Sequence, residues 1–237
     1  MKKRIWELDA LRGLGILGMI AIHVAFDLIV LFRVWQPEST ALFDFGQDWG
    51  GVIFLLLSGI CVTLGAKPVK RGIAVFACGM LVTAVTVGMY LLHFSGAGII
   101  IYFGVLHCLG VCMLLWPVFR KSPAWLLLLL GVVLAAAGLY LKFSDIRVAT
   151  SLLTPFGLPS YTFSSSDYFP LLPNLGYFLL GAFLGRTVYK KKESLLPGAN
   201  LRNPVIRFLL FCGKHSLIIY LLHQPVIAAI IGIATML

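Results

Sequence analysis

Three ionisable side chains lie on one apolar stretch near the start of the chain. Arg12, His23 and Asp27 all fall within segment 11–32, whose other residues are almost entirely apolar. Ionisable groups in such a segment are costly in a membrane and usually face a protein interior or a functional path. Spacings of eleven and four residues bring the three side chains to nearly one face of a helix. The pattern predicts a cation about 16 Å along the helix from a His–Asp pair.

A neutral imidazole held by a carboxylate is a common arrangement for a general base. We therefore predict that His23 removes a proton from a hydroxyl or an amine and that Asp27 orients its ring. Two structural interpretations stay open beside this one. Arg12 can serve as an anchor at the membrane surface or pair with Asp9, three residues earlier, and His23 can be a hydrogen-bonded packing residue.

Other polar residues occur in the later apolar runs. His107, His223 and Asn174 lie in such runs and together can line one polar cavity or a proton path. Asp48 precedes Trp49, Gly50 and Gly51, which we expect to open the second helix. There the two glycines permit either a close approach to an anion at the helix N-terminus or simply a tight entry turn. Neither the histidines nor the five cysteines have the spacing of a metal site, so we expect no metal.

The composition predicts that these residues are held by an α-helical membrane protein. Hydrophobic residues make up 60% of the 237 residues and charged residues 12%, and the mean hydropathy is +0.98. Soluble domains carry about 45–50% apolar and about 25% charged residues. We read the first apolar run as a retained helix rather than a cleaved signal peptide. We expect one all-α domain over residues 1–237 with seven transmembrane helices, at 11–32, 49–66, 72–94, 99–119, 124–141, 171–189 and 216–236.

The distribution of basic residues predicts the orientation of these helices. All but three of the 19 Lys and Arg residues lie on the side of the N-terminus, the exceptions being Arg33, Lys142 and Arg147. The N-terminus is therefore expected in the cytoplasm and the C-terminus outside, as an odd number of spans requires. The net charge of +10 follows this pattern and does not indicate a nucleic-acid partner. The expected location is a bacterial inner (plasma) membrane, crossed several times.

Three further segments have a recognisable role. Residues 203–212 are apolar but short, and Asn203 with Pro204 suits the start of a helix at the membrane surface. Gly181 and Gly185 form a small-residue pair that predicts close helix packing, within the chain or in a homodimer. The outer segments 33–48 and 142–170 are long enough to be lids or binding loops.

The chain also resembles a known family. The run from Leu8 to Gly13, followed by His23, resembles the Arg-x₁₀-His motif of membrane acyltransferases. More specifically, the chain is similar to the catalytic domain of heparan-α-glucosaminide N-acetyltransferase. The matching stretches are Glu7–Asp27, Trp49–Gly59, Tyr102–Val111, Asp167–Arg186 and Gly213–Pro225. The resemblance implies a membrane enzyme that takes an acyl group, typically acetyl, from cytoplasmic acyl-CoA and passes it to an acceptor on the far side.

The resemblance also implies roles for single residues. His23 matches the histidine of the motif, and Arg12 matches its basic partner, which lies toward the CoA. Trp49, His107 and His223 are expected around the acyl-CoA. The two histidines would line the acyl tunnel or stabilise the oxyanion. In the lysosomal enzyme the catalytic histidine directly precedes the Trp-x-Gly element. Here Asp48 stands before Trp49, so the base is His23 or Asp48, or the chain is not catalytically equivalent.

Three classes of function fit these observations. The first is a transferase that uses acetyl-CoA or another acyl-CoA, moving its acyl group to a polar acceptor such as a sugar or an envelope glycan. The second is a proton-coupled transporter or flippase, although the sequence has no repeated halves. The third is a membrane scaffold without catalysis, which does not explain the cost of so many polar groups within the membrane.

Overall fold

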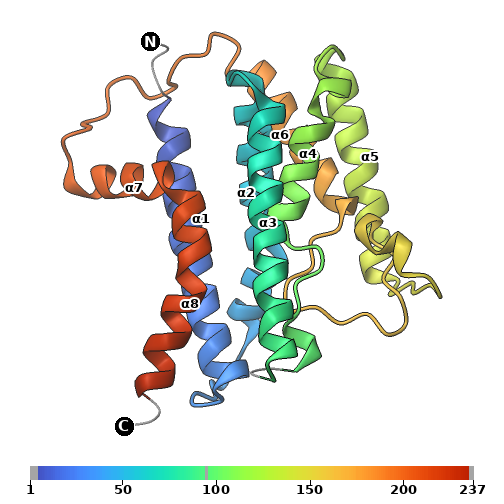
Figure 1. The fold of residues 1–237 in the computed structure, drawn as a ribbon. Coiled ribbons are helices and arrows are strands. Elements are labelled where there is room, and N and C mark those ends of the chain that lie inside the picture. Colours follow the sequence, from blue (N-terminus) through green and yellow to red (C-terminus); the bar gives the residue numbers. More distant parts are fainter. Residues whose placement is uncertain (1–4, 94–95, 235–237) are drawn as a thin grey trace. The chain divides into compact units, whose positions relative to one another are not determined.

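The computed structural model describes residues 5–93 and 96–234, and Figure 1 shows its helices. Within these residues the chain is helical and contains no β-strand, as the composition predicts. The chain divides into two compact units. The first comprises residues 1–54 and 191–237, and the second comprises residues 55–190. Helix α2 (Ala41–Leu64) has its first part in one unit and its last part in the other.

The first unit is built around α1 (Trp6–Phe26), which continues into a π-helical turn, η1 (Asp27–Leu31). Helix α7 (Pro204–Lys214) lies crosswise to α1, packs against it and leads into α8 (Ser216–Ala234), as Figure 1 shows. A Cβ atom at Gly13 would overlap the carbonyl oxygen of Leu209, and one at Gly213 would overlap that of Asp9. Glycine at these two positions therefore lets the backbones of α1 and α7 touch.

The start of α7 follows the predicted local chemistry. The side-chain oxygen of Asn203 accepts hydrogen bonds from the backbone N–H groups of Val205 and Ile206, at 2.9 and 3.4 Å. Pro204 occupies the first turn, where its missing N–H has no helical partner to lose. The prediction of a short helix before the last span is confirmed, and its position at the membrane surface stays a prediction.

The second unit pairs α3 (Pro68–Leu91) with α4 (Val105–Phe119) and α5 (Ala124–Phe143) with α6 (Leu171–Thr187). Two short 3₁₀ segments, η2 (Ala97–Ile99) and η3 (Ser151–Phe156), lie in the connections. On α6, a Cβ at Gly181 or Gly185 would collide with α2, at Leu56 and at Thr63. Gly181 and Gly185 therefore pack against α2 within the chain. The homodimer stays a prediction, and this glycine pair no longer supports it.

Five helices among the described residues are long and apolar enough to cross a membrane. They are Trp6–Leu31, Ala41–Leu64, Pro68–Leu91, Ala124–Phe143 and Ser216–Ala234. The predicted spans at 99–119 and 171–189 correspond to shorter helices of 15 and 17 residues. At about 1.5 Å per residue, the 15-residue α4 falls short of a hydrocarbon core of about 30 Å. Seven spans are therefore not confirmed, and the predicted orientation stays a prediction.

Helix α2 begins earlier than its apolar run suggests. It starts at Ala41, eight residues before the predicted start at Trp49. The Thr40 hydroxyl donates to Asp44 at 2.9 Å, and the Ala41 N–H donates to the Ser39 hydroxyl at 3.3 Å. These contacts fix the first turn. The prediction that Trp49 opens the helix is wrong, because polar residues such as Asp48 lie within its first two to three turns.

The basic residues of the N-terminal segment are only partly covered by the structure. Lys2, Lys3 and Arg4, which contribute to the predicted orientation, lie outside the described residues. Arg12 is the first basic residue of the described part.

Candidate functional site

His23 lies on α1, and its hydrogen bond defines the tautomer of its ring. Its Nδ1 atom lies 2.9 Å from the carbonyl oxygen of Met19, one turn earlier on the same helix. A carbonyl oxygen only accepts hydrogen bonds, so Nδ1 carries the proton of the neutral ring. The lone pair therefore lies on Nε2, which is the atom able to take a proton from a substrate.

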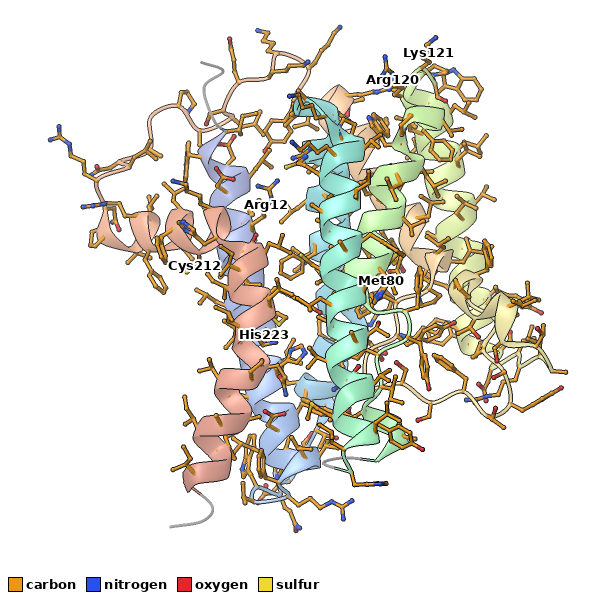
Figure 2. All side chains as sticks on the ribbon, in the orientation of Figure 1. Arg12, Met80, Arg120, Lys121, Cys212 and His223 are labelled. Atoms are coloured by element: carbon orange, nitrogen blue, oxygen red, sulfur yellow. The ribbon has the colours of Figure 1, made fainter. Side chains whose placement is uncertain are left out.

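His223 on α8 repeats this arrangement beside His23. Its Nδ1 atom is bonded to the carbonyl oxygen of Tyr220, so its lone pair also lies on Nε2. The side chain is buried, and Nε2 has no hydrogen-bond partner. The two imidazole rings meet edge to face, with their centroids 4.7 Å apart. Figure 2 labels His223 on α8 and Arg12 on α1, both within the first unit.

Asp27 is fully buried where α1 passes into its π-helical turn. Its Oδ1 atom accepts a hydrogen bond of 2.7 Å from the side-chain amide of Gln224 on α8. The other carboxylate oxygen, Oδ2, and the amide oxygen of Gln224 are buried without hydrogen-bond partners. π-Helical turns are frequent at functional sites.

The predicted hydrogen-bonded pair of His23 and Asp27 is therefore wrong in its contacts, although both residues lie in the site. The ring of His23 bonds the carbonyl of Met19, because Nδ1 of a helical histidine can reach the carbonyl four residues earlier. The carboxylate bonds Gln224 instead. Gln224 carried no predicted role, and the available signal was a polar side chain between His223 and Pro225 in an otherwise apolar helix.

We call His23, Asp27, His223 and Gln224 the histidine–aspartate cluster. Five buried side-chain polar atoms of the described residues have no hydrogen-bond partner, and three of them belong to this cluster. Such an atom costs about 1–3 kcal/mol when it stays unpaired. All three are acceptors: a carboxylate oxygen, an amide oxygen and an imidazole nitrogen. The cluster thus concentrates proton-accepting capacity inside a membrane helix pair.

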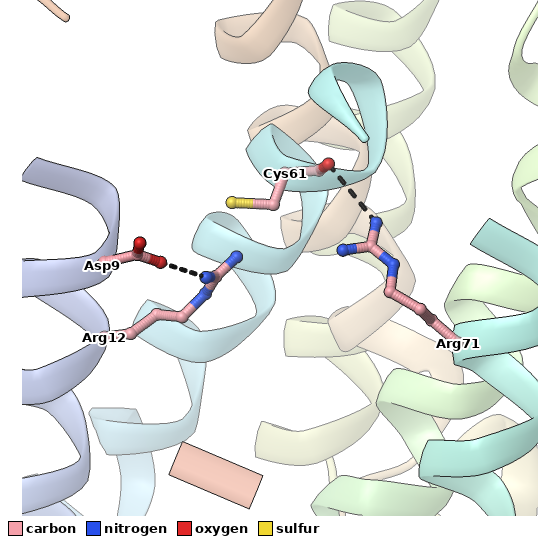
Figure 3. Close-up of polar contacts among 4 residues, drawn as sticks. All are labelled: Asp9, Arg12, Cys61 and Arg71. Carbon is pink, nitrogen blue, oxygen red and sulfur yellow. Dashed lines mark hydrogen bonds and ion pairs between the residues drawn. The ribbon is translucent and has the colours of Figure 1, made fainter. Parts of the chain in front are cut away.

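Arg12 lies nearer the N-terminal end of α1 and pairs with Asp9. Its Nη1 atom is 2.9 Å from Asp9 Oδ1, as Figure 3 shows. This confirms the alternative that the two residues, three apart, form an ion pair. The Arg12 side chain is partly exposed, at 25% of its surface. A separate contact in Figure 3 belongs to the second unit, where Arg71 donates to the carbonyl oxygen of Cys61 at the end of α2.

The loop before α7 is fastened to the same end of α1. The carboxylate of Glu7 accepts hydrogen bonds from the Ser194 hydroxyl and the Leu195 N–H, at 2.8 and 2.7 Å. The indole N–H of Trp6 donates to the Leu196 carbonyl oxygen at 3.0 Å. Segment 191–203, with the exposed Lys191, Lys192 and Arg202, is thus held at the N-terminal end of α1.

His107 has a structural position in the second unit. Its Nδ1 accepts from the Gly104 N–H at 3.2 Å, so Nε2 carries the proton and donates to the Thr83 hydroxyl at 3.2 Å. Thr83 in turn donates to the Ile101 carbonyl oxygen at 2.6 Å. Both ring nitrogens are satisfied and the ring is buried. His107 therefore caps the start of α4, and its place around the acyl-CoA stays a prediction.

Asp48 and Trp49 lie inside α2, and Asp48 is exposed. The face of α2 toward α1 is formed by Gly46 and Gly50, which approach the side chain of Ile22. The proposed anion site at a helix N-terminus is thus corrected, because this stretch is the helix interior. The role of Asp48 as a base and that of Trp49 at the acyl-CoA stay predictions.

The long segment 142–170 is fastened to the start of α4. The hydroxyl groups of Ser165 and Ser166 donate to the carbonyl oxygens of Ile100 and Ile99, at 2.9 and 2.8 Å. Asp167 accepts from the Val105 N–H at 3.2 Å. Nearby, the Asn174 amide donates to the Pro170 carbonyl oxygen at 2.7 Å, where the loop meets the start of α6. These hydrogen bonds hold segment 142–170 against the start of α4 within the second unit.

Fold and site together define a membrane protein of several helices with a buried His–Asp–Gln cluster. A family model described as "Heparan-alpha-glucosaminide N-acetyltransferase, catalytic" matches residues 4–225. The chain belongs to this family, which implies a transmembrane acetyltransferase. No curated protein and no solved structure gives a significant match. Within the described ranges, no group of three or more His, Cys, Asp or Glu residues is placed to hold a metal ion.

Proposed function

We propose that this protein transfers an acetyl group from acetyl-CoA to a hydroxyl or amine of a polar acceptor, with the histidine–aspartate cluster as its catalytic centre. One observation carries the proposal. Two imidazoles direct Nδ1 to backbone carbonyl oxygens and leave Nε2 for a substrate, within a membrane helix pair and beside a buried carboxylate. Membership of the acetyltransferase family agrees with this chemistry.

The reaction follows from the tautomers of the two rings. Nε2 of His23 takes the proton of the acceptor O–H or N–H while the acceptor atom bonds the thioester carbon. The C–S bond then breaks, and the imidazolium returns the proton to the CoA thiolate. Asp27 lies one turn beyond His23 on α1, and its carboxylate stabilises the positive charge that develops on the ring during the transfer. No residue of the cluster needs to form an acyl intermediate in this direct transfer.

The geometry changes the role expected for His223. A neutral ring with its proton on Nδ1 has no free N–H to donate to an oxyanion. His223 therefore stabilises a developing oxyanion only after it has taken a proton itself. It fits better as a second acceptor that holds the nucleophile beside His23, because its Nε2 has no other partner.

Arg12 and the basic segment 191–203 are proposed to bind the phosphates of CoA. They lie at the N-terminal end of α1, along the helix from His23. That separation, about 16 Å, suits a cofactor whose phosphates and thioester are far apart. The distribution of Lys and Arg supports a cytoplasmic position for this end and an acceptor on the far side of a bacterial inner membrane. The acceptor is proposed to be a sugar or an envelope glycan.

Thermal unfolding of the detergent-purified protein with and without acetyl-CoA tests the proposal. A ligand at 100 times its Kd stabilises the folded state by about 2.7 kcal/mol, which raises the unfolding midpoint. We expect this shift to shrink in Arg12→Ala. The matched control is Arg147→Ala, which removes another Arg–Asp pair, in segment 142–170. A folded protein that responds to neither acetyl-CoA nor CoA would contradict the proposal and favour proton-coupled transport by the same buried cluster.

A further inference from the structure

We infer that Asp27 and Gln224 form a recognition subsite that binds a second hydrogen-bond donor of the acceptor, beside the group that is acetylated. Gln224 is then a residue that determines acceptor specificity. This inference rests on the proposed function and assigns the Asp27–Gln224 pair a task beyond the electrostatic role of Asp27 in the transfer.

The contact between the two side chains is specific. The Gln224 amide donates to Asp27 Oδ1 at 2.7 Å and so connects α8 to the π-helical turn after α1. One acceptor on each side chain is left over, Asp27 Oδ2 and Gln224 Oε1. Asp27 has no exposed surface, and both left-over atoms are buried. The hydrogen-bonded pair thus presents two acceptors for which the described residues provide no donor.

The chemistry of these atoms decides what can bind them. A carboxylate oxygen and an amide oxygen only accept, so their ligand has to bring O–H or N–H groups. Phosphate and thiolate groups are excluded, because they bring negative charge and acceptors to a buried carboxylate. The amide groups of CoA do carry N–H donors, but CoA is proposed to approach His23 from Arg12. Asp27 lies four residues beyond His23 on α1, away from Arg12, so the pair is assigned to the acceptor substrate.

The reacting group of the acceptor already has a partner. Its proton goes to Nε2 of His23, with His223 beside it. A donor for Asp27 and Gln224 must then come from another hydroxyl or amino group of the same molecule. The subsite selects acceptors with two or more donors over simple alcohols and amines, because the latter leave the buried oxygens unpaired.

The inference is tested with two probes that share a six-membered ring and an amine, glucosamine and cyclohexylamine. Only glucosamine has hydroxyl groups. We would measure acetyl-CoA-dependent acetylation of both by wild type, by Gln224→Met and by the control Gln36→Met at an exposed glutamine. Wild type is expected to prefer glucosamine, in kcat/KM, by about 100-fold, within the range that hydrogen-bonding sites reach. In Gln224→Met this preference, the ratio of the two kcat/KM values, should fall to near unity, so the loss with glucosamine should far exceed the loss with cyclohexylamine.

Equal losses for both probes in Gln224→Met would overturn the inference, since they would show a general role in folding. An unchanged preference would overturn it too. Asp27→Asn serves as the second variant, because it keeps the size of the side chain and one oxygen for Gln224 while a donor replaces an acceptor. It should lower the preference for glucosamine as well, and a variant that retained the full preference would contradict the assignment.

Binding separates this inference from the proposed function. Glucosamine should raise the unfolding midpoint of wild type and not that of Gln224→Met, and cyclohexylamine should raise neither strongly. Stabilisation by acetyl-CoA without any response to glucosamine would overturn the subsite and leave the transferase intact. The absence of both responses would overturn both.

Discussion

Replacing Gln224 by leucine should destabilise the protein far more than replacing Gln224 and Asp27 together. In the single variant, the carboxylate of Asp27 stays fully buried and loses the one hydrogen bond that its oxygens make with described residues. In Asp27→Leu/Gln224→Leu, no buried polar atom of this pair is left. The two variants therefore separate the cost of an unpaired carboxylate from the cost of changing the packing.

The size of the effect follows from the contact. A hydrogen bond to a charged group contributes about 1.5–3 kcal/mol, and leaving its buried partner unpaired adds to the loss. We therefore expect Gln224→Leu to lower the free energy of unfolding by about 2–4 kcal/mol. Replacing a buried polar pair by apolar groups is often neutral or stabilising, so the double variant should lie within about 1 kcal/mol of wild type.

The assay is thermal unfolding of the purified variants in one detergent, with Asp27→Leu completing the cycle. For a chain of this size, 1 kcal/mol corresponds to about 2–4 °C in the midpoint. Gln224→Leu should thus unfold roughly 4–16 °C below wild type, and the double variant should regain most of that difference. A double variant that is as unstable as the sum of its single variants would refute the reasoning, because the two residues would then not interact.

Three further predictions concern other parts of the chain. Gly213→Val should lower stability in thermal unfolding by about 1–3 kcal/mol through overpacking against α1, whereas Gly198→Val, where a Cβ meets no neighbour, should have little effect. His107→Ala should also lower stability, by about 1–3 kcal/mol for the lost cap of α4. Kinetic assays should show a nearly unchanged kcat for the folded fraction, and a selective loss of kcat would instead support a role of His107 at the acyl-CoA. Burial raises the pKa of Tyr168 to about 12, so folding is favoured below pH 10 and this contribution is lost as pH rises from about 10 to 12; the pH dependence of unfolding in Tyr168→Phe should lack this loss, and identical curves would contradict it.

The sequence predicted the start of one helix correctly and the start of another wrongly. The start of α7 was predictable because Asn203 and Pro204 act locally, through bonds to the next few residues. The start of α2 was missed because hydropathy alone marks Asp44 and Asp48 as outside a span. The helix nevertheless continues through them, since its first turn is set by Ser39 and Thr40.

The count of spans shows the same limit. Residues 99–104 are apolar enough to extend α4, and the sequence predicted a span there. In the structure Ile99 ends the 3₁₀ segment η2, and residues 100–104 lie outside any helix; Ser165 and Ser166 bond the carbonyl oxygens of Ile100 and Ile99. Apolar composition indicates burial or lipid contact and does not specify a helix. The prediction made from it therefore overestimated the length of α4.

Three of the four members of the histidine–aspartate cluster were predictable, and their contacts were not. His23, Asp27 and His223 stand out because ionisable residues are rare in apolar spans. The bond from Gln224 to Asp27 joins residues 197 positions apart, and a single sequence carries no signal of that pairing. His107 looked equivalent to His223 in sequence, but the ring of His107 has partners at both nitrogens, whereas Nε2 of His223 has none among the described residues.

Acetyl transfer in proteoliposomes tests the central claim most directly. Labelled acetyl-CoA and glucosamine would be supplied to wild type, His23→Ala and His223→Ala, with His93→Asn at an exposed histidine as the control. We expect labelled product from wild type and His93→Asn, and at least a 100-fold lower rate from His23→Ala, as loss of a general base implies. A His23→Ala variant that binds acetyl-CoA and transfers acetyl at the wild-type rate would contradict the assignment of the histidine–aspartate cluster as the catalytic centre.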